Sequence, residues 1–285
     1  AALAADVLLM ATWGPTYIVT KIAIREVPPL TLAALRFLIT ALVLLPFAVA
    51  AGGLKRLPQP LPIRDIVAMA LTGFVLYYAF FNYALEYGSA SQGALIQALL
   101  PVGVAIAAVI VLKEKLSKTR VSGIALAVLG VAIIVVAGKS DSASPNPLLG
   151  AVLMLFSVVA WSIYTVQVKR LAEVEPTVLL TAIAAVGTLI QIPLVAFELA
   201  RQPQPLAIST QGWASVVFLG AIASGLGLLV YNRALRLLDA SLVGTYINLV
   251  PLVGVVSAVL LLGESLEGWQ ILGSVLALVG AWLAS

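Results

Sequence analysis

The sequence predicts an all-α polytopic membrane protein in which ten transmembrane helices form two inverted five-helix repeats, with both termini in the cytoplasm. The first observation is composition: 62% of the 285 residues are hydrophobic and 10% are charged, and the mean hydropathy is +1.13, whereas soluble domains carry roughly 25% charged residues. The second is that apolar runs of about 20 residues, the length that a bilayer requires, alternate with short polar joints. The third is an internal repeat.

The repeat is a match of residues 82–130 to residues 232–280 at a fixed offset of 150 positions. Apolar segments match through shared composition, but asparagine, proline, glutamate and glycine that match at one offset indicate a true repeat. The matching pairs are Asn82 and Asn232, Pro101 and Pro251, Glu114 and Glu264, Gly123 and Gly273, and Gly130 and Gly280; at an offset of 148, Trp13 also matches Trp161, Lys21 matches Lys169 and Pro28 matches Pro176.

Clusters of proline, glycine and serine mark the joints between the expected helices. The polar stretch 139–147 is the expected linker between a first repeat over residues 1–138 and a second over residues 148–285. Residues 3–22 are too long for a signal-peptide core and lack a preceding basic segment, so we expect a true span there. In chain order, the ten expected spans are 3–23, 30–50, 64–86, 90–112, 118–138, 148–168, 177–198, 212–236, 240–262 and 268–285.

The basic residues predict the orientation of the spans. With the N-terminus inside, eleven lysines and arginines lie in cytoplasmic joints and four lie on the other side, as the excess of positive charge in cytoplasmic loops requires. Because each repeat has an odd number of spans, the second repeat enters the membrane upside down. The loop 113–120 is accordingly basic, whereas its copy 263–270 contains no positive charge.

The composition also excludes several classes of function. The chain contains no cysteine and no histidine, which excludes disulfides, thiol chemistry and the usual zinc and haem ligands. Mid-membrane clusters of acids are not evident either, so we expect no metal, no cofactor and no enzymatic activity. The net charge of +4 lies in loops and reflects topology, so the expected partner is the lipid bilayer and not nucleic acid.

These motifs resemble the drug/metabolite transporter superfamily, in particular its ten-span proteins with two EamA domains. The likeness rests on Pro101, Glu114-x-Leu116 and Gly123 to Gly130, on their copies Pro251, Glu264-x-Leu266 and Gly273 to Gly280, and on Trp13-Gly14 and Arg36. Among these proteins the chain is most similar to YddG-type exporters of aromatic and other neutral amino acids.

The resemblance implies a secondary transporter of the bacterial inner membrane that works as a monomer. It would export small neutral or zwitterionic metabolites, such as amino acids, by alternating access through a central cavity. Multidrug efflux of cationic aromatic compounds is the alternative, which would benefit from a buried carboxylate that the sequence does not show. A membrane enzyme or a passive channel is a third class.

The first and sixth expected spans each present an aromatic face. Trp13 and Tyr17 share one helical face in the first span, and Trp161 and Tyr164 share the matching face in the sixth. Tryptophan and tyrosine often form belts at the membrane surface. Both tryptophans, however, lie well inside their spans, where indole and phenol groups need polar partners. A cavity-lining role is therefore favoured over a belt.

The third and eighth spans repeat a tyrosine and an asparagine. Tyr78 and Asn82 lie on one face of the third span, and Tyr231 and Asn232 lie on the equivalent face of the eighth. An intramembrane asparagine fits an interhelical hydrogen bond as well as it fits a ligand contact, and both roles stay open. We treat all four residues as candidate substrate-binding residues.

The mid-span prolines suggest a binding region near the membrane centre. Pro101 and its copy each remove a backbone donor; a static kink is possible, but a pair of broken helices at a binding site fits better. Gln97 lies on the same face as Pro101, and Tyr246 and Asn248 lie in the ninth span. We expect spans one, three, four, six, eight and nine to wall the cavity, with aromatic rings binding the substrate's side chain.

Structural roles are expected for two further groups of residues. Gly123, Gly130, Gly273 and Gly280 would let the fifth and tenth spans pack closely and hold the repeats together. Glu114 and Glu264 follow the fourth and ninth spans. A carboxylate is poorly placed at a helix C-terminus but well placed just before the N-terminus of the next helix, and each is expected to be a structural anchor between paired helices, in preference to proton coupling.

Arg36 is a lone cation inside the second span. It lies about 9 Å from the start of that span at 1.5 Å per residue. We expect its side chain to extend to the outer surface, where Glu86 at the end of the third span offers a partner.

Overall fold

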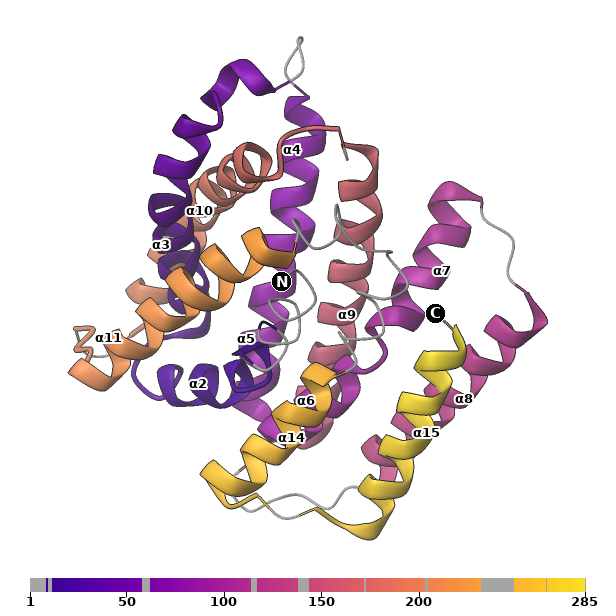
Figure 1. The fold of residues 1–285 in the computed structure, drawn as a ribbon. Coiled ribbons are helices and arrows are strands. Elements are labelled where there is room, and N and C mark those ends of the chain that lie inside the picture. Colours follow the sequence, from indigo (N-terminus) through magenta and orange to yellow (C-terminus); the bar gives the residue numbers. More distant parts are fainter. Residues whose placement is uncertain are drawn as a thin grey trace.

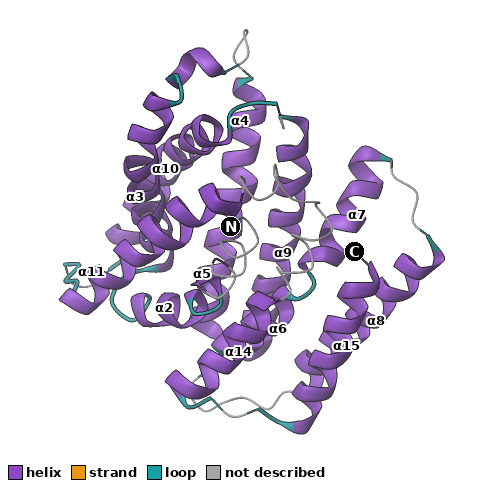
Figure 2. Ribbon diagram, viewed as in Figure 1, coloured by secondary structure: helices purple, strands orange, loops and turns teal. Residues whose placement is uncertain are grey.

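The computed structural model describes residue 9 and residues 12–57, 62–113, 117–137, 144–171, 173–202, 205–231, 249–264 and 266–284. Within these ranges all regular structure is helical (Figure 2). The elements in chain order are α2 (Thr16–Ala23), α3 (Pro29–Ala50), the 3-10 helix η1 (Gly53–Arg56), α4 (Ile63–Met69), the π-helix η2 (Ala70–Leu76), α5 (Tyr77–Tyr87), α6 (Ala90–Gln97), α7 (Leu100–Leu112), α8 (Lys118–Ala137), α9 (Pro147–Arg170), α10 (Pro176–Ala200), α11 (Thr210–Val217), the π-helix η3 (Phe218–Leu226), α14 (Leu249–Leu262) and α15 (Gly268–Ala284).

Seven helical segments in the described ranges are long and apolar enough to cross a membrane. They are Pro29–Ala50, Ile63–Tyr87, Ala90–Val111, Lys118–Val136, Pro147–Val168, Pro176–Ala200 and Thr210–Tyr231, and Val250–Leu262 and Gly268–Ala284 are shorter apolar helices. Large apolar side chains project from their outer faces; Val136 and Leu260, for example, are 85% and 76% exposed. Such faces suit lipid better than water, and the chain is an all-helical polytopic membrane protein. Ten spans with both termini inside stay a prediction.

The fourth expected span is broken in its middle. α6 ends at Gln97, and α7 begins at Leu100 with Pro101 in its first turn. Proline is well tolerated in that turn, because the first N–H groups of a helix have no intrahelical acceptor. Pro251 likewise lies near the beginning of α14. Pro101 therefore starts a new helix instead of bending a continuous one.

The third and eighth expected spans each contain a π-helical stretch. η2 joins α4 to α5, and η3 continues α11, and the two stretches overlap when the chain is shifted by 150 positions. π-turns are rare and often lie at functional sites. The sequence does not predict these π-helical stretches, because the same types of residue occur in π-helical and in α-helical turns.

α8 and α15 run side by side at one edge of the molecule (Figure 1). Their glycines bring the two backbones into contact. A Cβ added to Gly123 would lie 2.6 Å from the Ala284 nitrogen, and one added to Gly130 would lie 2.5 Å from the Ala277 nitrogen. Gly273 and Gly280 meet the backbone of α8 in the same way. Small residues permit such close approach of helices in membranes.

Glu264 connects the end of α14 to a helix of the first repeat. Its two carboxylate oxygens accept hydrogen bonds from the backbone N–H groups of Ala90 and Ser91, at 2.9 Å each, where α6 begins. A carboxylate is favourable there because a helix N-terminus carries partial positive charge. This contact fits the expected structural anchor between paired helices, and the helix that Glu264 caps is α6 and not the following helix α15. Glu114 lies outside the described residues.

Two more glutamates bind the start of a helix: Glu198 caps the first turn of α3 as Glu264 caps α6, and Glu26 holds the N-cap residue of α11. Glu198, at the end of α10, accepts hydrogen bonds from the N–H groups of Leu30 at 3.0 Å and Thr31 at 2.7 Å in the first turn of α3. Glu26, after α2, accepts from both the N–H and the hydroxyl of Ser209, at 2.8 Å each, before α11. All three glutamates link a residue before position 138 to one after position 147, at the same end of the bundle.

Candidate functional site

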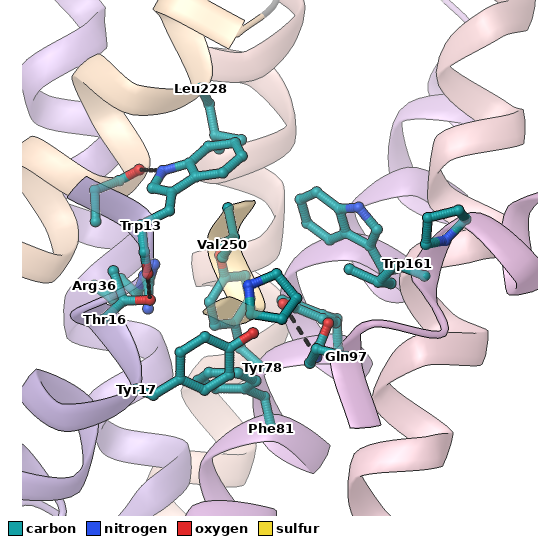
Figure 3. Close-up of a pocket in the computed structure, with 15 residues that line it drawn as sticks. Trp13, Thr16, Tyr17, Arg36, Tyr78, Phe81, Gln97, Trp161, Leu228 and Val250 are labelled. Atoms are coloured by element: carbon teal, nitrogen blue, oxygen red, sulfur yellow. Dashed lines mark hydrogen bonds between the residues drawn. The ribbon is translucent and has the colours of Figure 1, made fainter. Parts of the chain in front are cut away.

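A cavity lies where helices from both repeats converge (Figure 3). Its volume is about 80 Å³, which is room for several water molecules at roughly 10–15 Å³ each. Aromatic side chains dominate the wall. The lining residues are Trp13, Thr16, Tyr17, Arg36, Tyr77, Tyr78, Phe81, Gln97, Leu100, Pro101, Trp161, Ala223, Leu228, Val250 and Pro251.

The wall comes from the expected spans with one addition. Spans one, three, four, six, eight and nine all contribute, and α3, the second span, adds Arg36. Six of the predicted site residues line the cavity: Trp13, Tyr17, Tyr78, Gln97, Pro101 and Trp161. The residue spacing in the sequence therefore identified side chains on several helices that the tertiary structure places around one cavity.

Trp13 is held against the π-helical stretch η3. Its indole Nε1 donates a hydrogen bond of 2.8 Å to the Ala223 carbonyl oxygen, and its ring centre lies 5.4 Å from that of Tyr231. The same stretch offers the Ser224 hydroxyl to Arg36. η3 of the second repeat therefore positions both an aromatic and a cationic residue of the first repeat.

Further aromatic rings form a continuous wall. Tyr77 contacts Trp161 with ring centres 4.7 Å apart and lies 5.7 Å from Phe81, which in turn lies 5.4 Å from Tyr17. Offset and tilted ring pairs at these distances are favourable beyond their buried area. Rings from α2, α5 and α9 thus offer an apolar surface to a flat or branched side chain.

Gln97 supplies a polar group at the break between α6 and α7. It is 2% exposed, and its Nε2 donates a hydrogen bond of 3.0 Å to the Ser157 hydroxyl. Its Oε1 is buried without a hydrogen-bond partner among the described residues. Buried amide oxygens normally have a partner, so this unsatisfied acceptor, on a side chain that lines the cavity, is a candidate contact for a donor group of a substrate.

The predicted position of the Arg36 side chain at the outer surface is wrong. Instead of reaching the outer surface, it is 5% exposed; its Nε donates a hydrogen bond of 2.6 Å to the Ser224 hydroxyl, and its guanidinium carbon lies 4.3 Å from the centre of the Tyr78 ring. The expected pairing with Glu86 is also wrong, because Glu86 is exposed at the end of α5. An ionisable residue within an apolar helix is a functional candidate by default, and that signal was present in the sequence.

The other predicted residues that the structure describes do not line the cavity. Asn82 is buried and its Nδ2 donates a hydrogen bond of 2.8 Å to the Pro29 carbonyl, which joins α5 to the start of α3. Tyr164 and Tyr231 lie in a second layer; Tyr164 is 4.9 Å from the Trp161 ring, and Tyr231 packs on Trp13. Asn232, Tyr246 and Asn248 lie outside the described residues.

No group of three or more carboxylates that could hold a metal ion is found in the described part of the chain. The cavity lining contains one cationic side chain and, among the residues that the structure describes there, no acidic one. The described lining can therefore bind and orient a solute through aromatic, amide and guanidinium groups.

Comparison with known proteins identifies the family. The EamA-like transporter family matches residues 1–136 and again residues 148–285. A probable amino-acid metabolite efflux pump of Salmonella typhimurium is 28% identical over 97% of this chain and 92% of its own length, and the same description applies to an Escherichia coli protein at 26% identity, with 97% and 92% covered.

Further similarity extends to archaea and to a solved structure. An uncharacterized transporter of Archaeoglobus fulgidus is 30% identical over 97% of this chain and 95% of its own length. A crystal structure with 23% identity has a TM-score of 0.70 and covers 100% of this chain and 97% of the other, which shows a shared fold. The family and these relatives are transporters and not enzymes, and the apolar helices indicate an integral inner-membrane protein. With two matched regions that span nearly its whole length, the chain belongs to the EamA-like transporter family.

Proposed function

We propose that the protein is a secondary transporter that exports small neutral or zwitterionic metabolites, chiefly amino acids and among them aromatic ones, by alternating access. The observation that carries the proposal is the position of the cavity. Its wall combines residues from α2, α3, α5, α6 and α7 with residues from α9, η3 and α14. A site between two repeats can open to either side when one repeat rocks against the other.

The lining suits an amino acid in three respects. The rings of Tyr17, Tyr77 and Trp161 offer apolar surface to a side chain. The Gln97 Oε1 can accept a hydrogen bond from an amino group. Two relatives are named probable amino-acid metabolite efflux pumps, which supports this substrate class.

The remaining parts of the proposal concern topology. Residues 1–138 and 148–285 form repeats of opposite orientation, both termini face the cytoplasm, and one chain contains the whole pathway, so the protein acts as a monomer. The break between α6 and α7 lies at the cavity, where Pro101 in the first turn of α7 and Pro251 near the start of α14 are both lining residues. Broken helices near the midplane expose backbone groups that a substrate can use.

Efflux of cationic aromatic compounds is the weaker function for this cavity. An aromatic cage attracts cations through the ring faces, but here Arg36 already occupies one face of Tyr78. A second cation in the same small cavity would be repelled by the first. The described lining contains no carboxylate to offset that repulsion.

Counterflow in proteoliposomes tests the proposal. Vesicles loaded with unlabelled phenylalanine, leucine or an organic cation such as tetraphenylphosphonium receive the labelled solute outside, at two pH gradients. We expect saturable exchange of the amino acids. Uptake of the cation driven by pH without amino-acid exchange would establish the alternative function, and flux that does not saturate or exchange would indicate a channel.

A further inference from the structure

The charge of Arg36 is not balanced within the described part of the cavity. Its Nε is bonded to the Ser224 hydroxyl, and the structure gives no hydrogen-bond partner for its two Nη groups among the described residues. A buried charge is costly unless it is paired. The wall of the cavity therefore holds a planar, positively charged group with free donors, and that fork matches the geometry of a carboxylate.

A second unsatisfied group lies in the same cavity. The Gln97 Oε1 is an orphaned acceptor, and Arg36 and Gln97 extend into one space from different helices (Figure 3). An unpaired donor fork and an unpaired acceptor complement a molecule with one carboxylate and one N–H group. The two contacts differ in strength, because a charge-assisted bidentate pair is roughly twice as strong as a neutral hydrogen bond.

We propose that Arg36 is the specificity-determining residue that binds the carboxylate of the substrate, so that the cavity selects carboxylates over amines. This inference rests on the proposed transport function. An acid that lacks the amino group should retain most of its recognition. An amine that lacks the carboxyl group should lose most of it, since it leaves Arg36 unpaired and adds a like charge.

Competition in the counterflow assay tests the selectivity. The labelled probe is phenylalanine, and the competitors are 3-phenylpropanoate and phenethylamine, which each lack one of its two charged groups. We expect 3-phenylpropanoate to compete at least about 10-fold more effectively than phenethylamine, as the loss of one charge-assisted contact implies. Equal competition by the two would overturn the role of Arg36 while leaving transport intact. Absence of phenylalanine exchange would instead refute the proposed function.

Variants separate charge recognition from structure. Arg36→Gln should abolish the preference for the acid, and Arg36→Lys should retain part of it, because a lysine keeps the charge without the fork. Arg201→Gln is the matched control, since Arg201 is exposed at the end of α10. An unchanged acid-to-amine ratio in Arg36→Gln would contradict the proposal. If Arg36→Gln does not fold, the relative competition by 3-phenylpropanoate and phenethylamine in the unmodified protein still tests the proposal.

A second inference follows from the three glutamate caps, which are independent of the cavity. Glu26, Glu198 and Glu264 each belong to one repeat and cap a helix of the other, all at one end of the bundle. Separation of the repeats at this end would break all three contacts together. We infer that the caps form the closed gate of the transport cycle.

Labelling of an introduced cysteine tests the gate, because the chain has no native cysteine. Leu100→Cys places a thiol in the cavity wall, and a membrane-impermeant maleimide is applied to each side of the membrane in turn. Adding Glu198→Gln should raise labelling from the gate side by about 10-fold, the shift that one lost charge-assisted hydrogen bond causes. Labelling from the opposite side should fall, because one conformation gains at the expense of the other.

Glu86→Gln is the matched control for the gate. Glu86 is exposed at the same end of the bundle and caps no helix among the described residues. We expect its labelling to equal that of the Leu100→Cys background. Equal rates in Glu198→Gln and Glu86→Gln would overturn the gate, and so would increased labelling from both sides at once, which indicates loosening of the fold.

Discussion

Replacement of Gly130 by alanine is the sharpest test of the packing between α8 and α15. A Cβ at this position would lie 2.5 Å from both the Ala277 nitrogen and the Gly273 carbonyl oxygen. Both are backbone atoms, so neither can rotate away. Ordinary van der Waals contact begins near 3.4 Å, and the two helices would have to separate by a substantial part of the difference.

The expected effect is a clear loss of stability. Overpacking of a tight contact destabilises by about 1–3 kcal/mol. In a chain of this size, 1 kcal/mol corresponds to about 2 °C in the melting temperature, and the variant should unfold roughly 2–6 °C lower. Because α8 and α15 come from different repeats, the loss should also reduce the yield of folded protein.

Thermal unfolding in detergent, followed by tryptophan fluorescence, measures the change. Gly268→Ala is the matched control: it makes the same substitution at the start of α15, where an added Cβ meets nothing within 4 Å. A melting temperature of Gly130→Ala equal to that of the control would refute the close approach of the two backbones, and with it the account of the glycine pairs.

Three further predictions concern the site and the topology. Trp161→Ala should lower amino-acid exchange about 10-fold through the lost aromatic contact, whereas Trp213→Ala, at a residue 46% exposed on α11, should leave it unchanged; equal effects in a transport assay would remove Trp161 from the site. Gln97→Leu should raise the KM for phenylalanine about 3- to 10-fold by removing the free acceptor, and an unchanged KM would argue against that contact. Lys118→Cys and Gly268→Cys should react with an impermeant maleimide from opposite sides of the membrane, and reaction from the same side would rule out inverted repeats.

Several features of the site could be predicted because they depend on local periodicity. Trp13 and Tyr17, like Gln97 and Pro101, are four residues apart, the spacing of one helical face, and both pairs line the cavity although turns at residues 14–15 and 98–99 interrupt the helices. The repeat then indicated which faces correspond in the two halves. The structure places these four residues and Trp161 around one cavity.

Other features depended on distances that no sequence pattern contains. Arg36 lies on α3 at a depth that suits either a surface or an interior position, and only the packing of α3 on η3 brings Ser224 within hydrogen-bond distance. Glu264 could be expected to cap some helix N-terminus, but Ala90 at the start of α6 is 174 residues away along the chain, and its proximity is evident only in the tertiary structure.

The sequence by itself determined that this chain is helical, that its helices suit a bilayer and that one module occurs twice. Composition and periodicity are sufficient for this, because each residue's polarity must match the lipid, water or protein that surrounds it. The tertiary structure decided which polar groups meet. Arg36, Glu198 and Glu264 each form hydrogen bonds with residues of the other repeat. The energy of a buried charge depends on its nearest neighbours in space, and these neighbours are determined only when the repeats pack together.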